Sequence, residues 1–323
     1  MKKVHPADSV SAGQRHAREE IMRYLSVLCT ALFLITSCGG GSSSGGGGSD
    51  ETSFDTSQYY YQPGDGDEMI YKVTVAANPP YYKKSAFTLE NTDIPDQYNY
   101  EALDGLEGNP HILETVTRGN DLSSCTDTTG LIYYTPEGEE IIDDQRYSTE
   151  PPVWLFTNVD YSTIDDEEPE SVVAGREYES TIVEDLFEHG NPEPIGERMI
   201  TTTMIPRDIV PVTVLETTYD EALRITTESF SEETIAGSTV TLTGSGTMWF
   251  GRNTGLVKVQ MEYTREEEEE NPESFDYLLE LADITLSADA VLPASLQIAP
   301  PARAVPLRSF MKNISHIAHP RLP

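Results

Sequence analysis

The chain has 323 residues, three cysteines and a formal net charge of −34. Residues 39–289 hold 52 acidic and 12 basic side chains, so this part of the chain carries a charge of −40. Nucleic acids and anionic lipid head groups require a basic face, and this composition therefore excludes both as partners of the acidic segment. Cationic ligands, divalent metal ions and simple solubility remain compatible with it.

The amino-terminal segment has the pattern of a secretory signal peptide. Arg23 precedes an uncharged stretch, residues 24–37, that contains the largely apolar run Leu25–Ile35. A membrane-spanning helix needs about 20 apolar residues, so this run instead fits the core of a cleavable signal. We predict that residues 1–37 are a signal peptide. Translation starts either at Met1 or, because residues 1–21 are polar and mixed in charge, at Met22.

The end of the apolar run, Leu34-Ile35-Thr36-Ser37-Cys38, resembles the processing box of bacterial lipoproteins. The resemblance implies cleavage before Cys38, a diacylglyceryl group on its thiol and, usually, an acylated new amino terminus. Two or more acyl chains anchor a protein stably, whereas one chain binds only marginally. Gly39 at the next position implies, by the same analogy, passage to the outer membrane of a diderm bacterium.

A flexible tether is predicted directly behind the anchor. Residues 39–49 are all glycine or serine, a composition that cannot bury apolar area and leaves the backbone free. We therefore assign residues 38–53 to the lipidated cysteine and its tether. Because Cys29 leaves with the signal, Cys125 is the one remaining candidate thiol. We expect it to be a partly buried small residue, with pairing between chains as the alternative.

The sequence of residues 54–288 predicts a single, mainly β domain. Segments rich in Val, Ile, Thr, Tyr and Phe are separated by turn residues at short intervals, which is typical of antiparallel sheets. We expect a β-sandwich or an open β-barrel, with room for one or two short helices, because residues 275–286 fit a strand or a helix. The predicted strands are Glu68–Ala76, His111–Arg118, Leu131–Thr135, Arg176–Val183, Glu197–Ile205, Ile209–Thr217, Ala222–Phe230, Ser238–Phe250 and Leu256–Thr264.

The clearest strand pattern lies near the end of this domain. Val257, Val259, Met261 and Tyr263 alternate with the more polar residues 258, 260, 262 and 264, as in a half-buried strand. Glycines at both ends of residues 251–255 predict a hairpin turn before this strand. The hairpin sequence of residues 246–258 resembles the closing part of uncharacterised β-rich bacterial lipoproteins and periplasmic proteins. That resemblance implies the fold and brings no catalytic residues with it.

The composition changes in residues 289–323. Arg303, Arg308, Lys312 and Arg321 occur with no acidic residue after Asp289, and six prolines interrupt regular structure. We expect a disordered, basic tail. The same charge pattern would also allow the tail to fold back on the acidic domain.

Few residues suggest chemistry. Asp65, Asp67 and Glu68 concentrate three carboxylates on a glycine-rich turn, which is a calcium-type ligand set, although a plain surface turn explains them as well. His111 and His189 lie too far apart in sequence to resemble a metal-binding helix, and no Gly-x-Ser-x-Gly motif is present. With so many acids, sequence cannot nominate a catalytic pair.

The sequence therefore predicts a lipid-anchored envelope protein, most simply a non-enzymatic binding or structural module. It would hold an envelope protein, a glycan or an apolar ligand, and it requires no cofactor apart from the candidate calcium ion. The alternative is a hydrolase that cuts envelope polymers with a pair of carboxylates.

Overall fold

The computed structural model describes residues 52–61, 63–76, 78–91, 94, 98, 110–135, 140–147, 153–160, 171–191, 193–267 and 271–286. The predicted signal peptide, Cys38, most of the tether and the basic tail lie outside these residues. No helix in the described ranges is long and apolar enough to cross a membrane.

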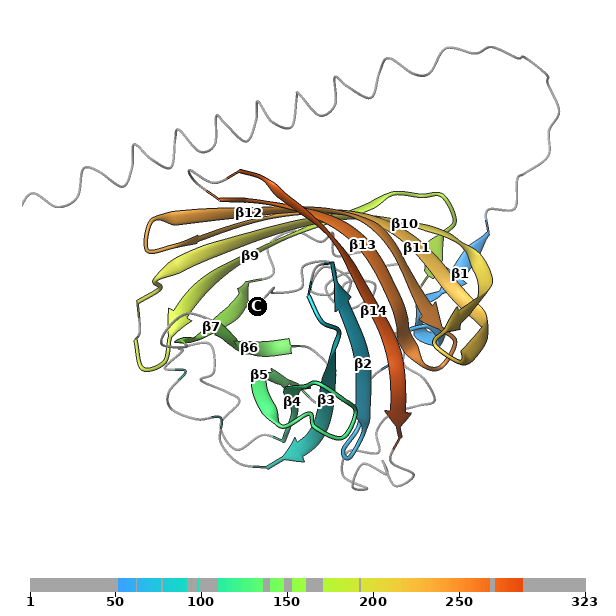
Figure 1. Ribbon diagram of the computed structural model, residues 1–323, viewed down its shortest axis with the longest axis horizontal. Coiled ribbons are helices and arrows are strands. Elements are labelled where there is room, and N and C mark those ends of the chain that lie inside the picture. Colours follow the sequence, from blue (N-terminus) through green and yellow to red (C-terminus); the bar gives the residue numbers. More distant parts are fainter. Residues whose placement is uncertain are drawn as a thin grey trace, which may run out of the picture. The chain divides into compact units, whose positions relative to one another are not determined.

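Strands make up nearly all of the described structure (Figure 1). One three-residue 3-10 helix, η2 (Thr56–Gln58), accompanies them, and residues 275–286 form a strand rather than a helix. The strands are β1 (Ser53–Asp55), β2 (Glu68–Val75), β3 (Tyr81–Glu90), β4 (His111–Gly119), β5 (Asp127–Tyr134), β6 (Glu140–Tyr147), β7 (Val153–Asp160), β8 (Ser171–Val173), β9 (Tyr178–Glu188), β10 (Gly196–Val214), β11 (Thr217–Ile235), β12 (Ser238–Gly251), β13 (Gly255–Glu267) and β14 (Glu273–Thr285).

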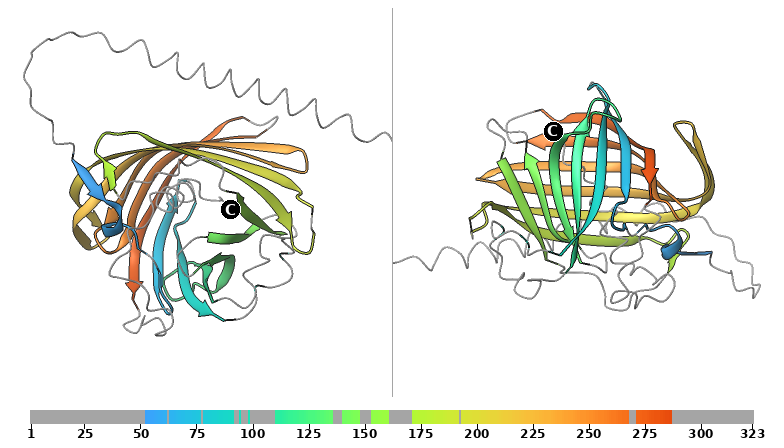
Figure 2. Two further views of the ribbon diagram at one scale, coloured as in Figure 1. Left: turned by 180° about the vertical axis from the view of Figure 1, so that it is seen from behind. Right: turned by 90° about the horizontal axis from the view of Figure 1, so that it is seen from below.

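Twelve of these strands close into an antiparallel barrel. Their order is β10-β11-β12-β13-β14-β2-β3-β4-β5-β6-β7-β9, and β9 completes the ring by pairing with β10 (Figure 2). β1 and β8 form a separate two-stranded sheet. The mainly β, antiparallel prediction is confirmed, and the barrel is closed rather than open. Closure removes the unpaired strand edges that an open barrel would expose.

The bounds of β10 differ from those of the strands predicted from the sequence. Two strands, Glu197–Ile205 and Ile209–Thr217, were expected, but one strand runs from Gly196 to Val214. Pro206 lacks the backbone N–H that a ladder needs, and the pairing with β11 shifts register between Pro206 and Asp208. The bulge lets the strand continue past the proline. Thr217 belongs to β11, after a two-residue turn in which Leu215 has a φ of 52°.

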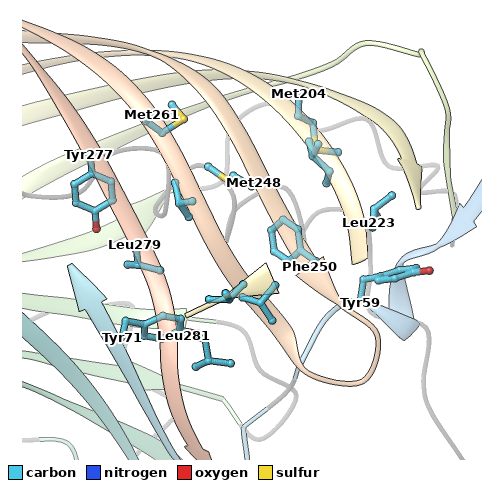
Figure 3. Close-up of a cluster of buried hydrophobic side chains, with 14 of the residues drawn as sticks. Tyr59, Tyr71, Met204, Leu223, Met248, Phe250, Met261, Tyr277, Leu279 and Leu281 are labelled. Atoms are coloured by element: carbon cyan, nitrogen blue, oxygen red, sulfur yellow. The ribbon is translucent and has the colours of Figure 1, made fainter. Parts of the chain in front are cut away.

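The pairings assign each strand residue to the inside or the outside of the barrel, because directly paired residues share a face. Val257, Val259, Met261 and Tyr263 of β13 all face inward and are at most 2% exposed, whereas Gln260 and Glu262 are exposed. The predicted alternation is therefore confirmed. These side chains belong to an interior apolar cluster that extends over β10–β14 and β2 (Figure 3).

η2 lies against the turn between β12 and β13. The Gln58 carbonyl accepts a hydrogen bond from the Asn253 backbone N–H at 2.7 Å, and Arg252 donates to the Gln58 side chain at 2.7 Å. Tyr59, immediately after η2, is 3% exposed and packs in the interior cluster. This contact fixes the segment before β2 on the barrel.

Candidate functional site

The predicted calcium turn is occupied by protein contacts. Asp65 accepts a hydrogen bond from the Leu89 N–H at 2.9 Å, and Asp67 accepts one from the Gly64 N–H at 2.6 Å. Glu68 forms an ion pair with Lys84 at 2.7 Å. In the described ranges, no group of three or more His, Cys, Asp or Glu side chains is arranged to hold a metal ion. Calcium binding at this turn stays a prediction.

Cys125 is a free, half-buried thiol in the segment between β4 and β5. It lies 3.7 Å from the Tyr82 carbonyl oxygen and 3.6 Å from that of Asp121. Burial raises the pKa of this thiol, which opposes thiolate formation. The environment therefore fits a packed cysteine better than a reactive one.

The structure brings both described histidines into one aromatic cluster, although they are distant in sequence. The outward faces of β5, β6, β7 and β9 carry an apolar group that the register places outside the barrel wall, and Tyr98 from the β3–β4 connection covers it. The buried members of this outer cluster are Tyr98, Tyr133, Ile142, Phe156 and Phe187. His111 packs on Tyr133 and His189 packs on Tyr98, with ring centroids 5.5 and 5.6 Å apart.

A buried carboxylate organises the outer cluster. Asp144 of β6 is fully buried, and its Oδ2 accepts a hydrogen bond from the Tyr98 hydroxyl at 2.7 Å. Nε2 of His189 lies 2.9 and 3.0 Å from the two Asp144 oxygens. Burial raises the pKa of Asp144, while the hydrogen bonds from Tyr98 and His189 lower it in part. The carboxylate thus fixes the imidazole and the phenol.

His189 is the accessible end of this arrangement. Its side chain is 28% exposed and stacks on Trp154 at 6.2 Å. A buried carboxylate that orients an imidazole is also found in nucleophilic catalysis, but there the other ring nitrogen must reach a hydroxyl or thiol. The hydroxyls that join this network are the phenols of Tyr98 and Tyr133, which are hydrogen-bonded to each other. The nitrogen of His189 that is bonded, Nε2, contacts Asp144 rather than a hydroxyl. The cluster therefore fits a structural role, in which Asp144 positions Tyr98 and His189, better than it fits a catalytic triad.

The inward face of this part of the wall, together with neighbouring β4, β10 and β11, carries buried polar side chains among apolar ones such as Leu155 and Leu186. Nε of Arg198 on β10 donates to Glu184 of β9 at 2.7 Å, and the guanidinium makes a second bond to the same carboxylate oxygen. On β4, Glu114 accepts a hydrogen bond from the Tyr134 hydroxyl at 2.6 Å. Other buried inward-facing polar side chains are Asp143, Thr157, Ser180, Thr202, Thr227, Ser229 and Ser231.

Two of these inward side chains lack hydrogen-bond partners. The hydroxyls of Thr157 on β7 and Thr202 on β10 are fully buried, and neither is bonded to any described residue. A buried polar group without a partner costs about 1–3 kcal/mol, so such groups are uncommon and call for an explanation. We take this polar section of the interior as the candidate binding site. Sequence reasoning missed it because Thr157 lies on a strand that was not predicted.

No protein-family model and no curated protein matches this chain. Two solved structures are similar to it. One is a candidate lipoprotein from Parabacteroides distasonis, with 12% identity and a TM-score of 0.35, covering 70% of this chain and 98% of its own. The other is a candidate exported protein with a YmcC-like fold from Bacteroides fragilis, with 10% identity and a TM-score of 0.35, covering 71% and 99%. Neither likeness assigns an activity.

Proposed function

We propose that this chain is a lipid-anchored protein of the bacterial envelope and that its barrel is a non-enzymatic binding module. The ligand is rich in hydroxyl groups, as an envelope glycan or the head group of a glycolipid is. The observation that carries the proposal is the pair of buried, unpartnered hydroxyls of Thr157 and Thr202 on the inward face. A ligand hydroxyl both donates and accepts, so it can satisfy either threonine.

The chemistry around these hydroxyls supports the same ligand class. Glu184 and Arg198 supply a buried acceptor and a buried donor, and Ser229 adds another hydroxyl on β11. Binding sites for small molecules combine apolar walls with a few placed polar groups. Here the interior apolar cluster supplies the walls next to the polar section. An amphiphile with a sugar head group matches both parts.

The anchor part of the proposal is supported by the sequence alone. The apolar run, the box that ends at Cys38 and the glycine-serine tether follow one another in the order that a lipoprotein precursor requires. The tether would let the barrel stand away from the outer membrane. The hydrolase alternative finds less support, because Glu184 is bound to Arg198 and Glu114 to Tyr134 rather than being arranged as a catalytic pair.

The test compares amphiphiles that share a ten-carbon chain and differ in the head group. Decyl maltoside, sodium decanoate and decyltrimethylammonium are titrated below their micellar concentrations into the full chain by calorimetry. We expect decyl maltoside to bind most tightly. Equal affinity for all three would mean that the alkyl chain alone drives binding, and no binding of any probe would refute the interior site.

A matched pair of variants locates the binding. Thr202→Val removes an inward hydroxyl, whereas Thr203→Val removes one from the opposite face of the same strand. A neutral hydrogen bond contributes about 1 kcal/mol, so Thr202→Val should weaken decyl maltoside binding by about fivefold. Thr203→Val should leave it unchanged. Equal effects of the two variants would place the ligand outside the barrel.

A further inference from the structure

We propose that Lys83 of β3 and Arg118 of β4 form an anion site on the inward face of the barrel, which binds a phosphate group of an amphiphilic ligand. The inference deepens the proposed function and rests on the proposed binding module, because it adds a phosphate to the hydroxyl-rich head group. Its evidence is separate from that for the buried threonines. It comes from the register of β2, β3 and β4 and from the partners of the basic side chains.

The register places both side chains on the inward face. Lys83 pairs directly with Tyr71 of β2 and with Arg118 of β4, and directly paired residues share a face. Tyr71 is buried and belongs to the interior apolar cluster, whereas Lys83 and Arg118 are half-buried. Both lie close to strand ends, since β3 begins at Tyr81 and β4 ends at Gly119. The pair therefore lies near one end of the barrel, at the edge of the apolar cluster.

Lys83 and Arg118 are like charges directly opposite each other, an arrangement that destabilises a sheet. Acidic side chains outnumber basic ones by 52 to 12 in residues 39–289, and most of the basic ones have a carboxylate at ion-pair distance. Those with such a partner are Lys84, Arg146, Arg198, Arg224, Arg252, Lys258 and Arg265. Within the described ranges, neither Lys83 nor Arg118 has one. Asp127, the direct partner of Arg118 on β5, pairs with Arg146 instead, so an anion from outside the chain would relieve the repulsion.

Arg118 is held in an orientation that suits an anion. Its guanidinium lies over the Tyr81 ring, with the central carbon 3.8 Å from the ring centroid. A guanidinium stacked in this way keeps the N–H groups at its edge available, and these match two oxygens of a phosphate. The Lys83 ammonium adds a second positive charge. A phosphate monoester carries about −1.5 to −2 charges at pH 7, so two cations match it better than they match a carboxylate.

The surroundings of this pair favour an amphiphile over a soluble anion. The charge of −40 on residues 39–289 repels anions at long range, so a phosphate needs a further source of affinity. Tyr71, beside Lys83, lies next to Leu281 in the interior apolar cluster (Figure 3). Tyr81 packs against the same cluster. A ligand with its phosphate on Lys83 and Arg118 could therefore lay an alkyl chain along this apolar surface.

Calorimetric titration of the full chain with four probes tests the site. Decyl phosphate, sodium decanoate and decyl maltoside share an alkyl chain, and inorganic phosphate has none. At about 0.15 M salt the Debye length is about 8 Å, so long-range repulsion is screened. We expect decyl phosphate to bind about tenfold or more tightly than decanoate and inorganic phosphate. Equal affinity for decanoate would overturn the phosphate, equal affinity for inorganic phosphate would overturn the amphiphile, and no binding of decyl phosphate would overturn the site.

Adjacent lysines of β3 provide a matched pair of variants. Lys83→Gln removes the inward charge, whereas Lys84→Gln removes one that faces outward and pairs with Glu68 at 2.7 Å. A hydrogen bond between charged groups changes affinity by about tenfold or more, so Lys83→Gln and Arg118→Gln should each weaken decyl phosphate binding by that factor. Lys84→Gln should leave it unchanged. Equal effects of Lys83→Gln and Lys84→Gln would show attraction to any positive charge and would overturn the site.

Melting temperatures measured without ligand show whether Lys83 has a structural role instead. Because Lys83→Gln removes repulsion from Arg118, its melting temperature should equal or exceed that of the wild type. A lower melting temperature would assign Lys83 a stabilising partner within the chain and would overturn the inference.

Decyl maltoside distinguishes failure of this inference from failure of the proposed function. If both hold, Thr202→Val weakens binding of the maltoside and Lys83→Gln weakens binding of the phosphate. Maltoside binding without decyl phosphate binding supports the hydroxyl-rich ligand and refutes the anion site. Decyl phosphate binding that depends on Lys83, without maltoside binding, supports the anion site and refutes the hydroxyl-rich ligand.

Discussion

Gly244 of β12 tests how tightly the interior is packed. It pairs with Tyr263 of β13 and lies inside the barrel, directly beneath the Tyr263 ring. A Cβ atom at this position would lie 2.4 Å from Cε1 and 2.6 Å from Cδ1 of that ring, and 2.8 Å from Oγ of Ser229. Ordinary contact begins at 3.4 Å, so Gly244→Ala requires the ring to move by about 1 Å.

The ring has little freedom to make that movement. Tyr263 is fully buried, stacks on Phe275 with centroids 5.5 Å apart, and meets Tyr277 edge-on at 6.0 Å. Overpacking of a filled core costs about 1–3 kcal/mol. Removing glycine from the unfolded chain offsets this by about 0.4–1 kcal/mol. We therefore expect Gly244→Ala to lower the free energy of unfolding by about 1–2 kcal/mol.

Urea denaturation followed by far-ultraviolet circular dichroism measures this difference. Ser245→Ala is the matched control, because Ser245 is the exposed neighbour on the same strand and points to solvent. Its free energy of unfolding should stay within about 0.5 kcal/mol of that of the wild type. An unchanged or higher stability of Gly244→Ala would refute the packing of Tyr263 over the glycine.

Four further predictions concern the anchor, the core, the acidic turn and the buried carboxylate. Cys38→Ala should abolish labelling with a radioactive fatty acid and release the protein from the membrane fraction; a variant that stays in the membrane contradicts the anchor. Met261→Ala, at a side chain 2% exposed, should cost about 2–5 kcal/mol in urea denaturation, and a cost below 1 kcal/mol would contradict its burial. Calcium, magnesium and sodium chloride should raise the melting temperature alike at equal ionic strength, whereas a rise at micromolar calcium that Asp65→Asn/Asp67→Asn removes would establish a calcium site. The folded-state pKa of Asp144 is raised above its ordinary value of 3.8, so its contribution to stability is present below that value and is lost as the pH rises through the folded pKa. Asp144→Asn should therefore flatten the fall in stability above about pH 4, and an identical pH profile in the variant would show that the buried Asp144 carboxyl does not cause that fall.

The strands in the second half of the sequence could be predicted because each of them has a recognisable strand pattern of its own. In β13 one face is apolar and the other polar, and a period of two needs no knowledge of the partner strand. The turns that join these strands are short, so the hairpins follow from local sequence. These strands form the side of the barrel that holds the interior apolar cluster.

The other side of the wall was harder to predict because its burial depends on distant residues. β6 contains the adjacent acids Asp143 and Asp144, which in sequence indicate a solvated loop, yet both are buried on opposite faces of one strand. Asp144 is stabilised there by Tyr98 and His189, each about 45 residues away along the chain. No local pattern carries that information. β3 and β7 were missed as well, and without them the ring could not be seen to close.

The two sides of the barrel differ in the face that carries their apolar side chains. A strand has only two faces, so outward placement of Ile142 and Phe156 leaves Asp143 and Thr157 to face inward. On β12–β14 and β2 the inward faces are largely apolar. The inward faces of β10 and β11 are mixed, because Met204 and Ile225 lie beside the polar side chains of Arg198, Thr202, Thr227, Ser229 and Ser231. The inward polar groups therefore extend from β4 and β6 through β7 and β9 to β11. Tyr98 packs against the outer cluster and stabilises it. A substitution at Tyr98 should therefore affect the inward polar side chains only indirectly, through a shift of the strands that lie between them.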